Sequence, residues 1–523
     1  MARIELCQAV LEAARGASQP SRYLKLNESQ KKALDLLVSI INANRDVPLG
    51  AVQGPPGTGK TSIIEAFAET ALPGFLEEVG ARDLILYVAP TNYLAVQAFT
   101  RITAALLARG GFKLRDILDM TRVYGHKIVP GRCKELERRY GIPEELVKRV
   151  AYGDIEPGVV RLIFSTEFQR VSGRLRGRPG KTHLIVDEAS KSPYFRAFIS
   201  VADEIMRFSD YPASLVALGD PEQAIAVPEG FRSSVPLLMN KIIKILHELS
   251  LENDNYVFLN ITYRIPKPSE EPISHGFYDG RLQAHHRAEY KLRSIKYIFE
   301  DNRRRVIGLL RSLGADDSET MRIHDAIYGA VTSDTPIVVL DTRREFTPAS
   351  RKVPTYDAFR ARVATKAALV LQAYASIEGD SSYFKTIVTS PYSDMASNIG
   401  FVFASKYASR ASRLLPPDSV TVHSLIGGEA DAIVAVMGKE YMSGSLRPSL
   451  LVDDNALLTI YFNEPQVLNV QLSRHKRLLV LVGSVDRLAA IRGRREWRKL
   501  SRTAERIIDL ERRGQALRLP LRT

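Results

Sequence analysis

The chain has 523 residues but only two cysteines, Cys7 and Cys133. Two thiols are too few for a disulfide framework, for a zinc site built from cysteines or for a cysteine-ligated iron–sulfur cluster. No apolar run reaches the length of about 18 residues that a membrane-spanning helix needs. The segment from Met1 to Gln19 holds no apolar stretch long enough for a secretory signal. We therefore expect a cytoplasmic protein that has no membrane partner.

Acidic residues are outnumbered by basic ones. The chain has 73 Lys and Arg against 59 Asp and Glu, a formal net charge of +14. Two stretches concentrate this excess: residues 485–523 hold twelve Lys/Arg against five Asp/Glu, and residues 285–313 hold eight against three. A basic protein surface attracts polyanions, most often nucleic acids. The alternative is that the cations only keep the protein in solution.

Residues 54–61 read Gly-Pro-Pro-Gly-Thr-Gly-Lys-Thr and fit the phosphate-loop pattern G-x-x-x-x-G-K-[ST]. An apolar run, Leu49 to Val52, precedes the loop, and a helix-compatible stretch, Ser62 to Ala71, follows it. In this pattern backbone N–H groups surround a polyphosphate, the lysine reaches the β- and γ-phosphates, and the last hydroxyl binds Mg²⁺. Lys60 is therefore the catalytic candidate and Thr61 the metal ligand. The pattern predicts an ATP site formed by Gly54, Pro55, Pro56, Gly57, Thr58, Gly59, Lys60, Thr61 and Ser62.

Two further motifs supply other parts of a phosphoryl-transfer site. The apolar run from His183 to Val186 leads into Asp187 and Glu188, and a second run leads into Gly-Asp-Pro-Glu-Gln, which ends at Gln223. Asp187 is predicted to hold Mg²⁺, partly through water, and Glu188 to orient and deprotonate the attacking water. The tight Gly-Asp-Pro turn can place the Gln223 amide at the γ-phosphate. The same phosphate loop is common in AAA+ ATPases, but those would not be expected to carry Gly-Asp-Pro-x-Gln.

Short apolar runs alternate with helix-compatible segments in both halves of the chain, which is the pattern of parallel α/β sheets. We predict two tandem α/β domains, residues 1–247 and 248–488, with nucleotide between them. A small helical insertion is expected at residues 127–157, and a basic C-terminal helix in a tail at residues 489–523. The strands are expected at residues 49–52, 84–88, 161–164, 183–186, 215–218, 257–259, 337–340, 386–388, 419–422, 432–436 and 478–482.

Together these motifs resemble those of superfamily 1 helicases, and most of all the superfamily 1B group that contains the nonsense-mediated-decay helicase and senataxin. The resemblance runs in collinear order from Leu26 to Ser484. It implies two tandem RecA-like (P-loop NTPase) domains with parallel sheets. It also implies that Gln30, in the segment Leu-Asn-Glu-Ser-Gln, hydrogen-bonds the adenine of ATP. In the first half it assigns nucleic-acid contacts to Pro90, Thr91, Asn92, Ser165 and Thr166.

The second half carries the rest of the resemblance. Thr-Tyr-Arg at residues 262–264 resembles the motif in which Tyr263 would stack on adenine and Arg264 would reach the γ-phosphate. The segment ending in Glu429 resembles the motif whose Gly-x-Glu lies near the ribose and the γ-phosphate. The segment ending in Arg474 resembles the final motif, whose arginine acts as a finger on the charge that develops during phosphoryl transfer. The turn that contains Pro391 and Tyr392 resembles a nucleic-acid-facing turn.

The resemblance implies an ATP hydrolase that uses ATP and Mg²⁺ as a helicase or translocase on single-stranded DNA or RNA, with 5′-to-3′ polarity. This chain departs from the family at Lys191, where relatives have glutamine. Only 25 residues precede Leu26, too few for the β-barrel that many relatives carry there. A nucleic-acid-stimulated ATPase that remodels protein–nucleic-acid complexes without processive unwinding is therefore the alternative. A nuclease–helicase and a non-hydrolysing nucleotide switch are the remaining hypotheses.

Overall fold

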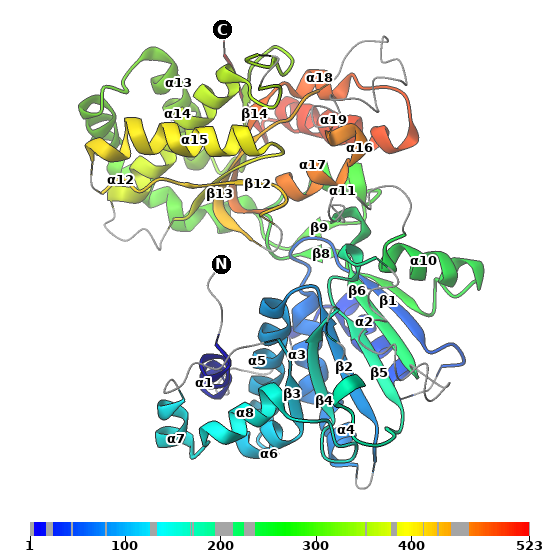
Figure 1. Cartoon of the computed structure of the whole chain (residues 1–523). Helices are drawn as coiled ribbons and strands as arrows, with labels where there is room; N and C mark the ends of the chain where they lie inside the picture. The colour runs from blue at the N-terminus through cyan, green and yellow to red at the C-terminus, as the bar shows by residue number, and fades with distance from the viewer. Residues whose placement is uncertain are drawn as a thin grey trace. The chain divides into compact units, whose positions relative to one another are not determined.

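The computed structural model divides the chain into two compact units: residues 1–55 with 59–259, and residues 56–58 with 260–523. Figure 1 shows the helices and strands of both units. In the described part of the chain, no helix is long and apolar enough to cross a membrane. The structure describes residues 5–16, 25–42, 45–78, 81–125, 133–167, 169, 172–193, 213–223, 236–350, 353–377, 384–411, 413–425, 428–440 and 460–521.

The first unit is built on a seven-stranded parallel sheet. Its strands are β1 (Leu49–Gln53), β2 (Leu84–Ala89), β3 (Thr121–Val123), β4 (Leu162–Thr166), β5 (Thr182–Val186), β6 (Ser214–Gly219) and β7 (Tyr256–Phe258). They lie in the order β3-β4-β2-β5-β6-β1-β7. Residues of β1 lie opposite β6 and β7, so that Val52 pairs with both Leu218 and Val257. Most of the strands are buried along their whole length, as expected for a parallel sheet covered on both faces.

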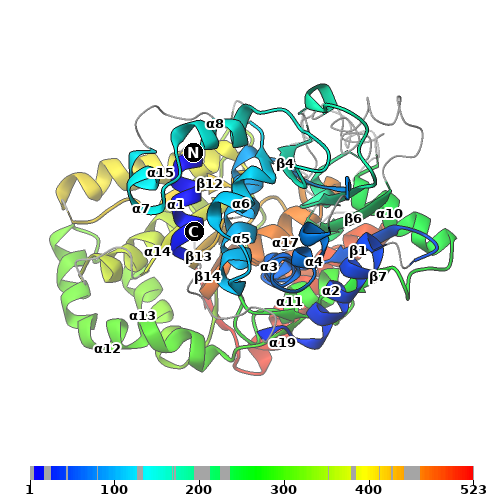
Figure 2. The same ribbon diagram turned by 90° about the horizontal axis from the view of Figure 1, so that it is seen from below.

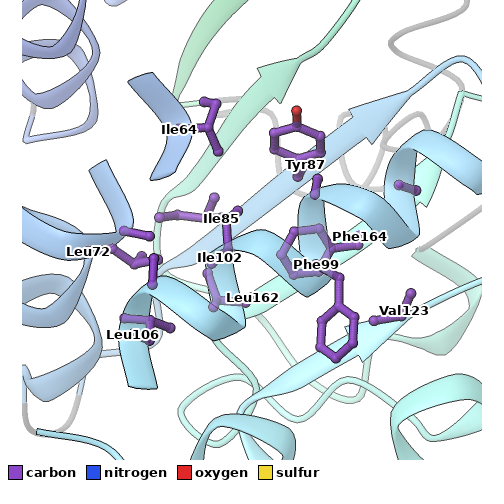
Figure 3. Close-up of a cluster of buried hydrophobic side chains, with 14 of the residues drawn as sticks. Ile64, Leu72, Ile85, Tyr87, Phe99, Ile102, Leu106, Val123, Leu162 and Phe164 are labelled. Atoms are coloured by element: carbon purple, nitrogen blue, oxygen red, sulfur yellow. The ribbon is translucent and has the colours of Figure 1, made fainter. Parts of the chain in front are cut away.

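Helices cover both faces of this sheet. They are α1 (Leu6–Gly16), α2 (Glu28–Ile41), α3 (Lys60–Thr70), α4 (Leu72–Glu77), α5 (Asn92–Arg109), α6 (Leu114–Asp119), α7 (Lys134–Tyr140), α8 (Glu144–Tyr152) and α10 (Leu238–Glu248). Alternate residues of β2 point to opposite faces: Ile85 and Tyr87 belong to the larger hydrophobic cluster, which includes α2, α3 and α5 (Figure 3). Leu84 and Leu86 belong to a second cluster, which α10 helps to form.

The helical insertion expected at residues 127–157 corresponds to α7 and α8, while residues 127–132 lie outside the described part of the chain. One disulfide joins Cys7 in α1 to Cys133, the residue before α7, with 5.3 Å between their Cα atoms. The two cysteines are 126 residues apart in the sequence. Their small number argues against a disulfide framework but gives no indication of this single link.

The second unit contains a six-stranded parallel sheet and a separate two-stranded sheet. Its strands are β8 (Ile261–Thr262), β9 (Gln283–Ala284), β10 (Ile337–Asp341), β11 (Thr386–Ser390), β12 (Asp418–Thr421), β13 (Ala430–Val436), β14 (His475–Gly483) and β15 (Leu517–Pro520). The larger sheet has the order β12-β11-β13-β14-β10-β15, and β8 pairs with β9. The helices are α11 (Glu271–Phe277), α12 (Ala288–Ser312), α13 (Ser318–Thr332), α14 (Ala358–Ile377), α15 (Ser393–Lys406), α16 (Ile460–Asn463), α17 (Gln466–Leu472), α18 (Val485–Ala489) and α19 (Arg498–Arg512). Two parallel α/β sheets of this kind are those of tandem RecA-like domains.

A buried ion-pair network ties together three loops of this sheet. Arg360 in α14 and Glu440 after β13 are both fully buried, and an Arg360 guanidinium nitrogen lies 2.7 and 2.8 Å from the two Glu440 carboxylate oxygens. The same carboxylate accepts hydrogen bonds from the backbone N–H groups of Phe346 and Ser484. The loops after β10, β13 and β14 are therefore held together where their strands end.

The expected strands all form, but one belongs to the other sheet. The strand expected at residues 257–259 was assigned to the second domain, whereas β7 pairs with β1 in the first sheet. The two units accordingly meet in the sequence between Leu259 and Asn260. The expected boundary lies earlier, between residues 247 and 248.

Residues 489–523 do not form a separate tail. Within them, β15 pairs with β10 at the edge of the second sheet, and α19 packs against α11. Gly276 in α11 permits this approach, because a Cβ atom there would overlap Thr503. Trp497 is held by a hydrogen bond of 3.0 Å from its indole N–H to the carbonyl of Phe462. The segment closes the core of the second unit, so its arginines serve packing and ion pairing as well as charge.

The buried His183 in β5 predicts a specific pH dependence of stability. Its Nδ1 lies 2.8 Å from Ser214 Oγ, and burial lowers its pKa to about 4. Because an unfolded histidine has a pKa of about 6.5, the unfolded chain binds more protons between these values. The free energy of unfolding should therefore fall as the pH drops from 6.5 towards 4. In urea unfolding of the first unit, His183→Gln should flatten this dependence, whereas the exposed His247→Gln should leave it unchanged. Equal slopes for all three proteins would contradict the assignment.

Candidate active site

Three neighbouring strands of the first sheet carry the nucleotide motifs. β5, β6 and β1 lie side by side and run in the same direction. Their carboxyl ends therefore reach the same edge of the sheet (Figure 1). The phosphate loop follows β1, Asp187 and Glu188 follow β5, and Gln223 follows β6. Residues far apart in the sequence thus meet at one edge, where open α/β sheets commonly bind ligands.

The phosphate loop has the backbone geometry of an anion cradle. Gly57 and Gly59 have φ angles of 71° and 81°, in the left-handed region that glycine enters without strain. Lys60 begins α3, and its Nζ donates a hydrogen bond of 2.6 Å to the carbonyl of Gly54. Among the described residues, Lys60 has no carboxylate within ion-pair distance. Its charge and the N-terminus of α3 therefore suit a polyphosphate.

The remaining loop residues differ in exposure. Gly54, Pro55, Pro56 and Thr58 are buried, Ser62 is half-buried, and Thr61 is exposed. Residues 56–58 group with the second unit. Within that unit, Thr262 Oγ1 donates to the carbonyl of Pro56 at 2.7 Å, and the N–H of Tyr263 donates to the carbonyl of Gly57 at 2.9 Å.

Gln30 is fixed next to the loop by the start of α2. Asn27 caps this helix: its Oδ1 accepts from Gln30 N at 3.0 Å, and Gln30 Oε1 accepts from Asn27 N at 3.0 Å. The buried Gln30 amide lies so close to Gly59 that a Cβ atom on Gly59 would be 2.5 Å from Gln30 Nε2. The capping box thus explains locally why a glutamine stands here, and it places the amide against the phosphate loop.

Asp187 and Glu188 occupy a buried and locally strained turn. Asp187 Oδ2 accepts a hydrogen bond of 2.8 Å from the hydroxyl of Tyr87, and Oδ1 accepts one of 2.9 Å from Glu188 N. Burial and the neighbouring Glu188 charge raise the pKa of Asp187, although Tyr87 and Lys60 oppose this shift. Glu188 has a φ of 50°, a conformation that costs energy for a residue other than glycine. Such strain is common where a side chain is aimed for chemistry.

Lys191 contacts the candidate base directly. Its Nζ lies 2.9 Å from Glu188 Oε2, and both side chains are largely buried. The 3-10 turn Ala189–Lys191 brings the two residues together one turn apart. This is the position at which the sequence departs from the resembled family, and it gives the Glu188 carboxylate a cationic partner. Tyr87 and Lys191 are the two neighbours of the acidic pair that motif reasoning missed.

Gln223 is part of a chain of side-chain hydrogen bonds. Gln53 Nε2 donates to Asp220 Oδ1 at 3.0 Å, and Gln223 Nε2 donates to Asp220 Oδ2 at 2.7 Å. The hydroxyl of Tyr256 donates to Gln53 Oε1 at 2.7 Å. The chain links the ends of β7, β1 and β6, so the Gln223 amide is held rather than free to rotate.

In the second unit, Arg264 is oriented by acceptors. Its Nε lies 2.9 Å from Glu429 Oε2, and a terminal nitrogen lies 3.4 Å from the carbonyl of Ser473. The other oxygen of Glu429 lies 2.8 Å from Lys476 Nζ. Burial alone would raise the pKa of Glu429, but Lys476 and Arg264 outweigh it and lower this pKa. Glu429 therefore stays ionised and acts here as a holder of two cations.

The remaining predicted nucleotide-binding residues of this unit are Arg474 and Tyr263. Arg474 follows α17 and is buried, as are Gln471 and Asn469 on that helix. Gln471 Nε2 donates to the carbonyls of residues 389 and 436. The Tyr263 carbonyl accepts a hydrogen bond of 2.8 Å from Lys291 Nζ. The centre of the Tyr263 ring lies 4.8 Å from the centre of the His285 ring.

The predicted nucleic-acid residues of the first unit fall into two groups. Thr91 and Asn92 are exposed at the start of α5, and Pro90 is half-buried, whereas Ser165 and Thr166 are buried in β4. Tyr93, which motif reasoning did not include, follows them and is 48% exposed. An exposed aromatic ring beside two exposed polar residues is the signal that could have found it.

The second-unit turn at Pro391 and Tyr392 is buried rather than open to a ligand. Tyr392 is 2% exposed and packs against Phe346. Its hydroxyl accepts a hydrogen bond from Lys439 N, and burial is the main cause of its raised pKa. In this structure, the ring therefore supports the loops around it. Contact between the Tyr392 side chain and nucleic acid stays a prediction, which would require the ring to become exposed.

Two family models match the chain, each described as an AAA domain: one covers residues 25–148 and the other residues 239–486. This pair of domains is typical of superfamily 1 helicases. Such domains imply ATP hydrolysis with ATP as the bound nucleotide, which is the activity that the motifs predict for this chain. No curated protein matches the chain.

Solved helicase structures are also similar to the chain. The helicase nonstructural protein 10 of an arterivirus is 15% identical, with a TM-score of 0.34 over 86% of this chain and 61% of its own. The DUF1998 helicase MrfA bound to DNA is 10% identical, with a TM-score of 0.39 over 93% of this chain and 52% of its own. Dbp5 of S. cerevisiae bound to RNA and ADP BeF3 is 11% identical, with a TM-score of 0.33 over 97% and 93%. The chain thus spans less than two thirds of the first two proteins.

The ion pair between Lys191 and Glu188 makes a testable prediction. While the Lys191 ammonium is paired with the Glu188 carboxylate, a water molecule must compete with the ammonium for this carboxylate. Lys191→Gln should therefore raise ATP turnover without nucleic acid by about two- to fivefold, the range expected for loss of one partly exposed ion pair. Lys244→Gln, which removes an exposed lysine of α10, is the matched control. Steady-state ATPase rates that are unchanged or lower in Lys191→Gln would show that the pair does not restrain Glu188.

Proposed function

We propose that the chain is an ATP-driven translocase or helicase on single-stranded nucleic acid, moving 5′-to-3′. The observation that carries this proposal is the convergence of Lys60, Asp187, Glu188 and Gln223 at one sheet edge of a helicase-family ATPase. Thr91 and Asn92, exposed at the next strand end of the same sheet, are the candidates for contact with the nucleic-acid backbone.

In this proposal each residue has one task. Lys60 binds the β- and γ-phosphates of ATP, and Thr61 and Asp187 are the residues that would hold Mg²⁺. The Asp187 carboxylate lies beside the Tyr87 hydroxyl and the Glu188 carboxylate, and such oxygen ligands suit a hard cation. Bound there, Mg²⁺ would neutralise charge on the phosphate oxygens. Glu188 takes the proton of the attacking water, and the Gln223 amide senses the γ-phosphate.

In this proposal, the second unit contributes further nucleotide-binding residues. We infer that Tyr263 stacks on the adenine, that Gln30 reads its edge, and that Arg264 and Arg474 act on the γ-phosphate. Glu429 holds Arg264 at 2.9 Å, so the guanidinium is already oriented when nucleotide binds. Because both arginines belong to a different unit from Lys60, hydrolysis would depend on the arrangement of the units and so could drive movement along a strand.

A second function is favoured by the small insertion. In the described residues, α7 and α8 are the helices that the insertion adds to the first unit. An insertion of two short helices offers little surface for splitting a duplex. The alternative is thus an ATPase that remodels protein–nucleic-acid complexes without processive unwinding. A strand-displacement assay beside an assay for displacement of a bound protein distinguishes the two.

Substitutions at the acidic turn and the lysine test the hydrolytic assignment. Lys60→Ala should abolish ATP hydrolysis, because it removes the positive charge that binds the β- and γ-phosphates. Glu188→Gln should retain ATP binding but stop turnover, and should trap a complex with nucleic acid. Binding of a fluorescent ATP analogue and steady-state phosphate release measure the two effects. Normal turnover in Glu188→Gln would refute its role as the base.

The two arginines make a separate prediction. Arg264→Ala and Arg474→Ala should each reduce turnover by on the order of 10³-fold, as expected for arginine fingers, and should weaken nucleotide binding much less. Arg410→Ala, on a short turn of the same unit, is the control and should retain activity. An Arg264 or Arg474 variant with a turnover close to that of the wild type would exclude that arginine as a finger.

A further inference from the structure

The longest helix of the second unit, α12, has an outer face that its packing does not explain. Leu292, Ile295, Phe299 and Val306 are buried, and α12 packs against α13 and α14 (Figures 1 and 2). The opposite face of such a helix is usually polar. Here it carries the α12 stripe, which we define as Tyr290, Arg293, Tyr297 and Arg304.

The two tyrosines of the α12 stripe are open to solvent. Tyr290 is 66% exposed and Tyr297 is 48% exposed, and they are the only strongly exposed tyrosines in the described part of the second unit. They are seven residues, or two helical turns, apart, which places them about 10 Å from each other along one side of α12. Each ring can therefore receive a separate ligand group.

The Tyr290 ring is also oriented by its neighbour. Its plane lies at 17° to that of His286, with 4.7 Å between the ring centres. His286 in turn contacts His285, at 4.6 Å between ring centres. One side of the Tyr290 ring is thus stacked, and the ring is held in place. A rigid, half-stacked ring costs little entropy when a second flat group stacks on it.

The arginines of the α12 stripe differ from the other cations of the helix. Lys296 and Arg303 lie on a side of the helix and pair with Asp334 and Asp325, at 2.8 and 3.1 Å. Arg311 follows Arg304 by seven residues, so it continues the line of the stripe, and it pairs with Asp316 at 3.5 Å. Arg293 and Arg304 have no acidic partner within ion-pair distance in the part of the chain that the structure describes. The two arginines next to the exposed tyrosines can therefore bind an anion without first giving up an acidic partner.

The acidic residues of α12 do not cancel the stripe. Glu289, Glu300 and Asp301 are exposed, against seven Lys and Arg between Ala288 and Ser312. The helix therefore has a net charge of +4. The two arginines alternate with the two tyrosines along one side. Aromatic rings for bases and free cations for phosphates are the combination that single-stranded nucleic acids require.

We propose that the α12 stripe is an auxiliary binding surface for single-stranded nucleic acid, with Tyr290 and Tyr297 stacking on bases and Arg293 and Arg304 contacting phosphates. This inference rests on the proposed function, because it supposes that the chain acts on such strands. It adds a surface on the second unit, outside the sheet edges that carry the nucleotide motifs. A strand long enough to reach it would be held at a second point during each ATPase cycle.

The test measures binding of fluorescent oligothymidylate and oligouridylate to the full chain by anisotropy. Each is used in a short form of about 8 nucleotides and a form several times longer, so that only the long form can occupy two surfaces. Tyr290→Leu with Tyr297→Leu should weaken binding of the long oligomers about tenfold or more, since stacking on each base contributes substantially. Binding of the short oligomers should not change. The DNA and RNA arms show which sugar the surface accepts.

The charge substitutions have a matched control on the same helix. Arg293→Gln with Arg304→Gln should reduce the salt dependence of long-oligomer binding by about 0.7 in log K per log salt for each phosphate that the variant no longer neutralises. Lys296→Gln with Arg303→Gln removes the same charge from the paired side positions and should have a smaller effect. Equal effects of the two pairs would overturn the proposal, because binding would then follow net charge and not the stripe.

A crosslinking measurement keeps the proposal testable if a variant folds poorly. Long oligomers carrying 5-iodouracil should crosslink the wild-type chain at Tyr290 or Tyr297. If the long oligomer binds fully but no crosslink forms in α12, the proposal is overturned. It is also overturned if polyglutamate displaces the long oligomer while the tyrosine variants bind this oligomer with wild-type affinity. If the wild type binds no oligomer of either length, the proposed function itself fails. If it binds both lengths and the stripe variants bind equally well, only this inference fails.

Discussion

The common direction of β5, β6 and β1 is the constraint on which the catalytic arrangement depends. In a parallel sheet every strand ends at the same edge, so three short motifs meet there without any contact being specified in the sequence. Register matters as much as direction, because a slip of one residue turns each side chain to the other face. Val186 lies opposite Ala217, and Ala217 lies opposite Ala51. This register places Gln53 beside Asp220, which also holds Gln223, so the sheet helps to fix the position of the Gln223 amide.

In the second unit, charged side chains are oriented before a ligand binds. Arg264 shares Glu429 with Lys476, and a carboxylate between two cations orients both. Oriented side chains lose less entropy on binding than free ones. The fully buried pair of Arg360 and Glu440 acts on a larger scale. Burying two charges costs desolvation energy, so such a pair is weak evidence for stability. Its hydrogen bonds to three loops indicate that it instead fixes the shape of the strand ends.

The sequence was sufficient for the fold class, whereas the roles of the site residues that short motifs define stay predictions. The alternation of apolar runs predicted the two sheets, and the phosphate loop, Asp187 and Glu188 were predicted from spacing alone. The assignment of β7 failed because a three-residue strand carries no signal for its partner. The burial of Tyr392 could not be predicted, because a motif gives the position of a residue in the sequence and not its exposure. Tyr87 could not be found, and the departure at Lys191 gave no role for that residue, since both depend on contacts with the acidic turn.

The number of Lys and Arg residues in a segment is a poor guide to whether the segment binds nucleic acid. Residues 489–523 are rich in arginine, yet Arg506 and Arg513 both pair with Glu271, and Arg518 pairs with Asp486 and Glu511. A cation that already has an acidic partner must give up that partner, at least in part, before it can bind a phosphate. In α12, Lys296 and Arg303 are paired in the same way, whereas Arg293 and Arg304 have no acidic partner among the described residues. The net charge of +14 therefore says less about a polyanionic partner than the positions of the few cations that the fold leaves without an acid.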